Sequence, residues 1–70
     1  MEFTPFARSR LRHHGLLVSD VEALVRESVI AIPTGSGKVL HEGVIGERLV
    51  SVIVDPAPPT TVVGVTARSL

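Results

Sequence analysis

The first part of the chain repeats apolar residues at the spacing of an α-helix. These positions, three or four residues apart, are Phe3, Phe6, Ala7 and Leu11. Gly15 is expected to end this helix, because glycine is favoured just beyond a helix C-terminus. The pattern therefore predicts a helix before Gly15 that buries these four residues and leaves Arg8 and Arg12 near the opposite, solvated side.

A second helix is predicted after Gly15. Ser19–Glu22 has the spacing of a capping box, in which the serine and glutamate side chains bond free backbone amides of the first turn. Val21, Leu24 and Val25 would then form its buried side. The sequence thus predicts a helix that begins at Ser19 and packs through these three residues.

Beyond Ser28 the pattern changes to β-branched runs bounded by turn residues, which is typical of strands. The four runs are Val29–Ile32, Val39–Ile45, Arg48–Val54 and Thr61–Thr66. Thr34–Gly37 and Gly46–Glu47 are short enough for hairpins, and Asp55–Pro59 makes a stiffer bend. We expect one α+β domain over residues 1–70, with two N-terminal helices packed on a four-stranded antiparallel meander.

Composition narrows the function classes. The chain has 70 residues and no cysteine, so neither disulfides nor cysteine-bound metal supplement its core. Seven Lys and Arg balance seven Asp and Glu, which argues against a polyanion binder that acts through overall charge. Phe3 and Phe6 are the only aromatic residues, so a broad stacking surface for nucleic acid is not expected. Without a long apolar run or a signal-peptide pattern, we expect a cytoplasmic protein with no membrane partner.

One short segment, residues 8–14, concentrates basic side chains in the order Arg-Ser-Arg-Leu-Arg-His-His. Arg10 and His14 fall within the apolar stripe of the first helix and should point toward the sheet. Strand alternation places His41 on one face with Val39 and Gly43, and either face of that strand can be the buried one. If the first helix packs near this strand, Arg10, His14 and His41 border a cleft.

A guanidinium that stabilises a pentavalent phosphate and a histidine that moves a proton suffice for metal-free RNA cleavage. The catalytic candidates are therefore Arg10, His14 and His41, and the candidate phosphate or RNA ligands are Arg8, Arg12, Arg48 and Arg68. An alternative stays open, in which Arg10 and His14 extend past the core edge and bond backbone carbonyls.

Two other motifs predict no ligand. Pro33–Lys38 resembles the centre of a phosphate loop, but Ile32 and Val39 occupy positions where that motif needs small or hydroxyl residues. His13 and His14 are adjacent on a helix and diverge by about 100°, so they do not converge on one metal ion. We expect neither a metal nor another cofactor.

The order of these motifs resembles small bacterial proteins with an N-terminal His-Ala-x-x-Arg-Met-x-x-Arg-Gly-Ile pattern, which are similar to RelE-type and BrnT-type toxins. The segments that carry the resemblance are Phe6–Leu16, Ser19–Val21, Glu42–Gly46 and Leu49–Asp55. Arg10 and Gly15 match as they stand. Phe6 replaces the histidine of the pattern and His14 replaces its second arginine, so a proton-transfer role would pass to His14 or His41.

The resemblance implies a fold of the barnase, colicin and RelE kind, metal-independent ribonuclease ancestry and an antitoxin protein as partner. A second hypothesis is a catalytically silent interaction module, because two short helices cannot cover both faces of the alternating valine strands. This hypothesis predicts a homo-oligomer. A third, RNA or DNA binding without catalysis, is disfavoured by the balanced charge and the scarcity of aromatic residues.

Overall fold

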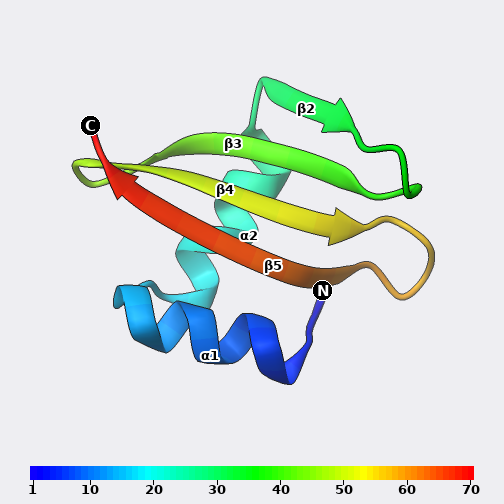
Figure 1. Cartoon of the computed structure of the whole chain (residues 1–70), viewed down its shortest axis with the longest axis horizontal. Coiled ribbons are helices and arrows are strands. Elements are labelled where there is room, and N and C mark those ends of the chain that lie inside the picture. Colours follow the sequence, from blue (N-terminus) through cyan, green and yellow to red (C-terminus); the bar gives the residue numbers. More distant parts are fainter.

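The computed structural model describes residues 1–70 and contains two helices and one five-stranded sheet. The elements in chain order are β1 (Glu2–Phe3), α1 (Pro5–His14), α2 (Val18–Glu27), β2 (Ile30–Pro33), β3 (Val39–Ile45), β4 (Arg48–Asp55) and β5 (Thr61–Ser69). The strands lie side by side in the order β1-β5-β4-β3-β2. α1 runs alongside β5, and α2 crosses behind the sheet near β3 (Figure 1).

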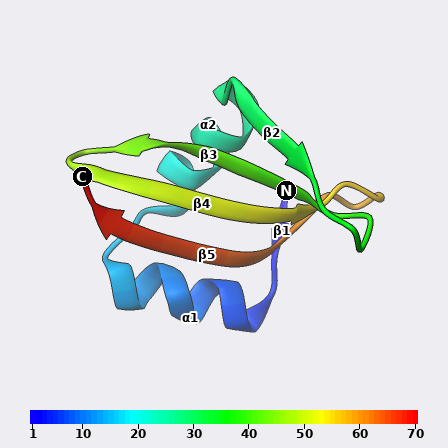
Figure 2. The ribbon, with the colours of Figure 1, turned by 45° about the horizontal axis from the view of Figure 1, so that its top comes forward.

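The α+β class and the antiparallel meander from β2 to β5 are confirmed. The expected four-stranded antiparallel sheet is wrong by one strand, because β1 joins it in parallel to β5 through Glu2–Thr61 and Phe3–Val62. Figure 2 shows β1 between the N-terminus and α1, next to the start of β5. Two residues are too few for strand alternation to be visible in the sequence.

Local signals fix both ends of α1. The Thr4 side chain accepts a hydrogen bond of 3.0 Å from the backbone amide of Ala7, and Pro5 follows in the first turn, where its missing amide costs nothing. Gly15 ends the helix in the left-handed region with φ of 66°, as predicted. The helix is therefore held by a threonine at its start and a glycine at its end.

The predicted start of the second helix at Ser19 is wrong. α2 begins at Val18, follows Leu17, and has no side-chain cap. Leu16 is buried, and its amide donates to the Leu11 carbonyl at 2.9 Å, which closes the end of α1 just before α2 begins. The capping box predicted at Ser19 is not formed.

The core lies between the helices and the inner face of the sheet. On that face the buried side chains of β4 and β5 are Val50, Val52, Val54, Val62 and Val65. The residues packed on them are Phe3, Ala7, Leu11, Leu16, Val21 and Leu24. Gly43 leaves room for this packing, since a Cβ there would lie 3.1 Å from Leu24 Cγ. Neither helix is long and apolar enough to cross a bilayer.

Candidate functional site

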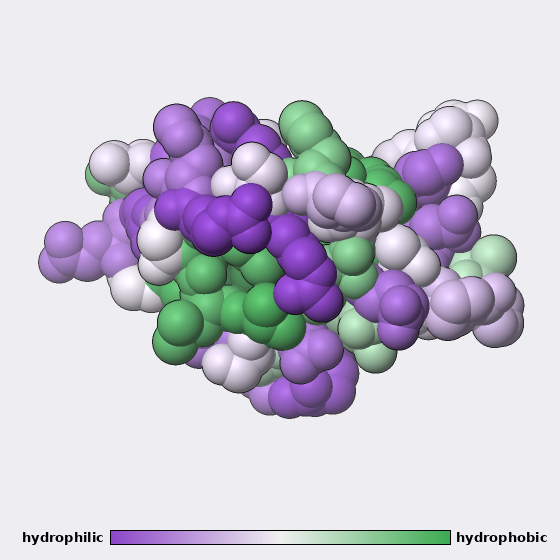
Figure 3. Space-filling view, turned by 90° about the horizontal axis from the view of Figure 1, so that it is seen from below, coloured by the Kyte–Doolittle hydropathy of each residue, from purple (hydrophilic) through white to green (hydrophobic).

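The two helices carry opposite charge. α1 has five basic side chains and no acidic one, and these are Arg8, Arg10, Arg12, His13 and His14. α2 has three acidic residues and one arginine within the sequence Val18–Glu27. A chain with no net charge therefore concentrates positive charge along one helix. Figure 3 views the molecule from below, the side on which α1 lies, and shows hydrophilic side chains around an apolar area left of centre, with smaller apolar areas above and to the right of it.

The predicted burial of Phe6 is wrong, because its side chain is 65% exposed. The helix begins only at Pro5, so Phe3 belongs to β1 and fills the core from there. The buried residues of α1 are therefore Ala7 and Leu11 alone, and the Phe6 side chain points to solvent. Phe6 then heads a stripe of every fourth residue, followed by Arg10 and His14.

Arg10 and His14 contact each other on the half-buried flank of α1. Arg10 Nη2 donates to His14 Nε2 at 3.3 Å. Because a guanidinium only donates, Nε2 carries the lone pair in this contact and the ring hydrogen of a neutral imidazole lies on Nδ1. Neither residue bonds a carboxylate here, so Arg10 keeps donors for an external anion.

The surroundings of His14 favour its neutral form. Burial lowers the pKa of His14 below its ordinary value, and the nearby charges of Arg10, His13 and Arg48 lower it further. The His13 and His14 rings meet edge to face, with centroids 5.0 Å apart. At neutral pH the imidazole of His14 is therefore a proton acceptor among cations.

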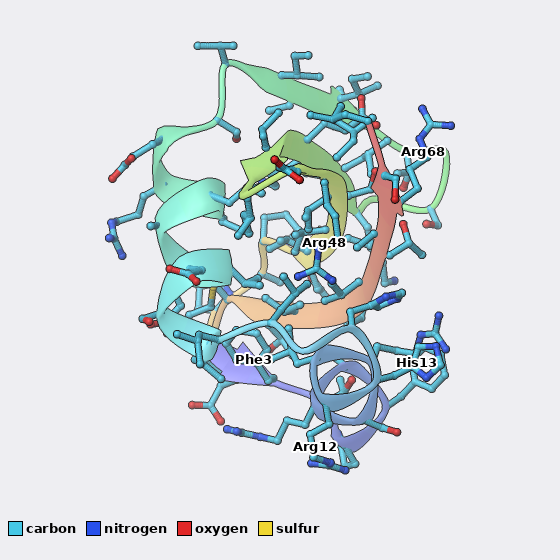
Figure 4. All side chains as sticks on the ribbon, turned by 90° about the vertical axis from the view of Figure 1, so that its left-hand side faces the viewer. Phe3, Arg12, His13, Arg48 and Arg68 are labelled. Carbon is cyan, nitrogen blue, oxygen red and sulfur yellow. The ribbon has the colours of Figure 1, made fainter.

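Arg48 has a structural role that the sequence did not predict. Its Nη1 donates to the backbone carbonyl of His14, one of the carbonyls left free at the end of α1. In Figure 4, Arg48 lies between the sheet and the helices. The alternative in which the Arg10 and His14 side chains bond backbone carbonyls is not what the structure shows, because these two side chains bond each other. Arg48 makes such a bond instead and joins the start of β4 to the end of α1.

The structure does not bring His41 to the Arg10–His14 pair. His41 lies on the inner face of β3, where its Nδ1 shares a hydrogen bond of 2.8 Å with Ser28 Oγ at the end of α2. α1 packs on β5, and β4 separates β5 from β3. The expected cleft between Arg10, His14 and His41 is therefore not formed.

The remaining arginine candidates also lie apart. Arg8 stacks over the Phe3 ring, with its guanidinium carbon 5.7 Å from the ring centroid. Arg12 is exposed and points away from the sheet, whereas Arg68 extends from β5 on the sheet face that the helices do not cover (Figure 4). Arg8 and Arg12 lie on one side of α1 and Arg10 on the other, because successive residues of a helix are about 100° apart. Arg68 lies outside this helix.

No group of three or more His, Asp or Glu side chains is placed to hold a metal ion. Sequence reasoning missed the exposure of Phe6 and the bond made by Arg48. A threonine followed by proline is typical of a helix start, so Thr4 and Pro5 indicate that the helix begins after Phe3. This signal could have corrected the predicted burial of Phe6. The contact of Arg48 depends on tertiary structure and had no local signal.

No protein-family model matches the chain, and no match is found among curated proteins or solved structures. What the site does must follow from its own chemistry. The site consists of α1, which has basic side chains and no acidic one, and of the neutral imidazole of His14 bonded to the guanidinium of Arg10.

Proposed function

We propose that this protein is a RelE-like toxin-family domain that binds the RNA backbone along α1 and cleaves it without a metal ion. The observation that carries the proposal is the set of five basic side chains on α1 with no acid among them. Arginine donors suit phosphate oxygens in particular. A partner antitoxin that masks this helix belongs to the same proposal.

The helix dipole alone does not account for this arrangement. Cations are favoured in the last turn of a helix, which explains Arg12, His13 and His14. Arg8 is the fourth residue of α1 and lies near the N-terminal end, where the dipole disfavours a cation and acids are normally enriched. A cation there, in addition to those of the last turn, supports an anion that binds along the helix.

Phe6 extends the same surface. Its ring is 65% exposed and lies about 6 Å along the helix axis from Arg10. An exposed aromatic ring next to a guanidinium suits an unpaired nucleotide, whose base stacks while its phosphate is bound. Single-stranded RNA is therefore the form of RNA that we propose for this site.

His14 supplies the proton acceptor in the proposed cleavage. When a phosphate draws Arg10 away, Nε2 of His14 is free to take the proton of the ribose 2′-hydroxyl. The 2′ oxygen bonds to phosphorus as the bond to the 5′ oxygen breaks, and the leaving oxygen takes a proton from water. Arg10 stabilises the charge on the phosphorane, and the products are a 2′,3′-cyclic phosphate and a 5′-hydroxyl end.

Binding is tested with a fluorescein-labelled single-stranded RNA in an anisotropy titration over a range of salt concentrations. Arg10→Ala and Arg12→Ala should each weaken binding and reduce the salt slope by about 0.7, the value for one lost phosphate contact. Arg26→Ala, an exposed arginine on the acidic helix, is the matched control and should change neither quantity. Equal losses in all three variants would contradict an α1 site.

Cleavage is tested separately on total RNA and on ribosome-associated mRNA. Expression should arrest growth, and both Arg10→Ala and His14→Ala should relieve the arrest and abolish cyclic-phosphate products on a denaturing gel. Intact RNA after incubation with the folded wild-type protein would remove the enzymatic part of the proposal. RNA binding in the titration above would still stand on its own.

A second candidate function, a protein-interaction module, is favoured by a different observation. Both helices pack on one side of the sheet, and the opposite face bears exposed or half-buried aliphatic side chains such as Leu40 and Ile53. Surface of this kind on a small domain marks a site of association. A domain that acts only in this way would leave RNA intact and would still associate with protein.

A further inference from the structure

The sheet face opposite the helices, here called the open face, is ordered in cross-strand rows. Strand register places Ile32, Leu40 and Ile53 in one apolar row across β2, β3 and β4. A second row, four residues further along β3, contains Val44 and Leu49 and ends at Arg68 on β5. Ile32 is 49% exposed and Val44 is 58% exposed, so the rows present apolar surface to solvent.

A polar row lies between the two apolar ones. It runs from Glu42 on β3 through Ser51 on β4 to Thr66 on β5. The Ser51 hydroxyl donates to Glu42 Oε2 at 3.0 Å, which fixes the carboxylate on the open face. Glu42, Ser51, Thr66 and Arg68 line one shallow hollow with Leu49. The open face is thus aliphatic at both ends and charged near its centre.

The charges of the open face complement each other across β4. Glu42 stands on β3, and Arg68 stands on β5 at the diagonal position. In a face-to-face dimer the two-fold axis lies between the two open faces, over the middle of β4 and perpendicular to the line from Glu42 to Arg68. This axis exchanges the two positions, so that each Glu42 meets the Arg68 of the other chain. Two opposite charges related in this way make a surface complementary to itself.

The area of the open face suits a weak dimer. β3, β4 and β5 have 7, 8 and 9 residues and β2 has 4, which together cover about 450 Å² at about 3.4 Å per residue and 4.8 Å between strands. Two such faces together bury about 900 Å², which is close to the lower bound of about 1,000 Å² for a specific interface. An association at micromolar concentration is the expected strength.

Neither edge of the sheet offers a long strand for pairing with a second copy. β2 forms one edge, has only 4 residues and ends in Pro33, which has no amide to donate. On the other edge β1 pairs with Thr61 and Val62 of β5, and α1 packs along β5. Two copies that met through β2 would therefore form few backbone bonds.

We propose that the open face binds the open face of a second copy of this chain, with Glu42 and Arg68 paired across the interface. The dimer buries the rows of Leu40, Ile53 and Leu49 and leaves α1 on the outside. This inference rests on the sheet alone and does not depend on RNA binding.

The first experiment measures the oligomeric state of the full chain by sedimentation equilibrium from about 1 to 100 μM. The wild-type protein should be a dimer in the upper part of this range. Leu40→Asp, on the open face, should be monomeric, whereas Leu17→Asp, at an exposed leucine between the helices, should remain dimeric. Circular dichroism establishes that each variant is folded.

The second experiment uses charge reversal and does not disturb the core. Glu42→Arg alone and Arg68→Glu alone should each weaken dimerisation roughly tenfold or more, because each homodimer then places like charges together. An equimolar mixture of the two variants should recover wild-type affinity as a heterodimer, since both contacts become Arg with Glu. The matched pair Asp20→Arg and Arg26→Glu, on α2, should leave dimerisation unchanged.

Recovery in the mixture supports the proposed interface. A wild-type monomer at 100 μM would overturn the proposal and would leave the open face to a partner of different sequence. A wild-type dimer that is indifferent to both charge reversals would overturn it as well, because the interface would then lie elsewhere.

Discussion

Replacing Arg48 with methionine tests the structural role of its guanidinium. Arg48→Met keeps most of the half-buried stem and removes the donor to the His14 carbonyl at the end of α1. The carbonyl then loses its charged partner, and the link between β4 and α1 is broken. The variant should therefore be less stable than the wild-type protein, even though no apolar core residue is changed.

The size of the effect follows from the type of bond. A hydrogen bond to a charged group contributes about 1.5–3 kcal/mol. A domain of 70 residues has a free energy of unfolding of roughly 3.5–10 kcal/mol, so the loss is a large part of the total. In a thermal melt, each kcal/mol of lost unfolding free energy lowers the melting temperature by about 4–8 °C.

The assay is a pair of urea and thermal melts followed by circular dichroism, together with the RNA titration. Arg26→Met on the exposed side of α2 is the control and should melt within about 0.5 kcal/mol of the wild-type protein. The Arg48→Met protein should also show a higher pKa for His14 in an NMR titration, because one nearby cation has been removed. Unchanged stability combined with lost RNA affinity would refute the structural assignment and return Arg48 to the phosphate ligands.

Three further predictions concern the same end of the molecule and the core. The pKa of His14 is lower in the folded protein than in the unfolded chain, so protonation of His14 favours unfolding. The urea midpoint should be constant above about pH 6.5 and should fall as the pH drops below it. His14→Gln should reduce this pH dependence. Gly15→Ala should cost about 1–2 kcal/mol in a thermal melt, because φ of 66° is unfavourable for alanine. Val52→Ala, at a fully buried position, should cost about 2 kcal/mol by urea melt, and a loss below 0.5 kcal/mol would contradict the packing described.

The parts of the fold that could be predicted are those with local signals. Gly15 ends α1 because glycine readily adopts the left-handed backbone angle found there. The four β-branched runs form strands, whose ends differ from the predicted ones by at most three residues. β1 could not be predicted, since its two residues are held by pairing with Thr61 and Val62, almost sixty positions later in the chain. The capping box predicted at Ser19 was wrong as well, because α2 begins one residue earlier, at Val18, and has no side-chain cap.

The site was harder to predict than the fold. Helical spacing correctly placed Arg10 and His14 on one flank of α1, because i and i+4 are neighbours on any helix. Whether His41 joined them depended on which strand α1 covers, and that is decided by the packing of Ala7 and Leu11 rather than by the spacing of the polar residues. Alternation correctly grouped His41 with Val39 and Gly43 on one face of the strand, but it left open whether that face was buried and which helix lay above it.

Arg68 offers a test that separates the two proposed surfaces. The sequence predicts it as a phosphate ligand, whereas the structure places it on the open face, on the other side of the sheet from the helices. If RNA binds along α1, Arg68→Glu should dissociate the dimer and leave the RNA affinity of each protomer unchanged at concentrations where both proteins are monomeric. Arg12→Ala should weaken RNA binding and leave dimerisation unchanged, because Arg12 points away from the sheet. Loss of RNA affinity in the monomeric Arg68→Glu protein would instead place the phosphate site on the open face. RNA binding and dimerisation would then both depend on Arg68.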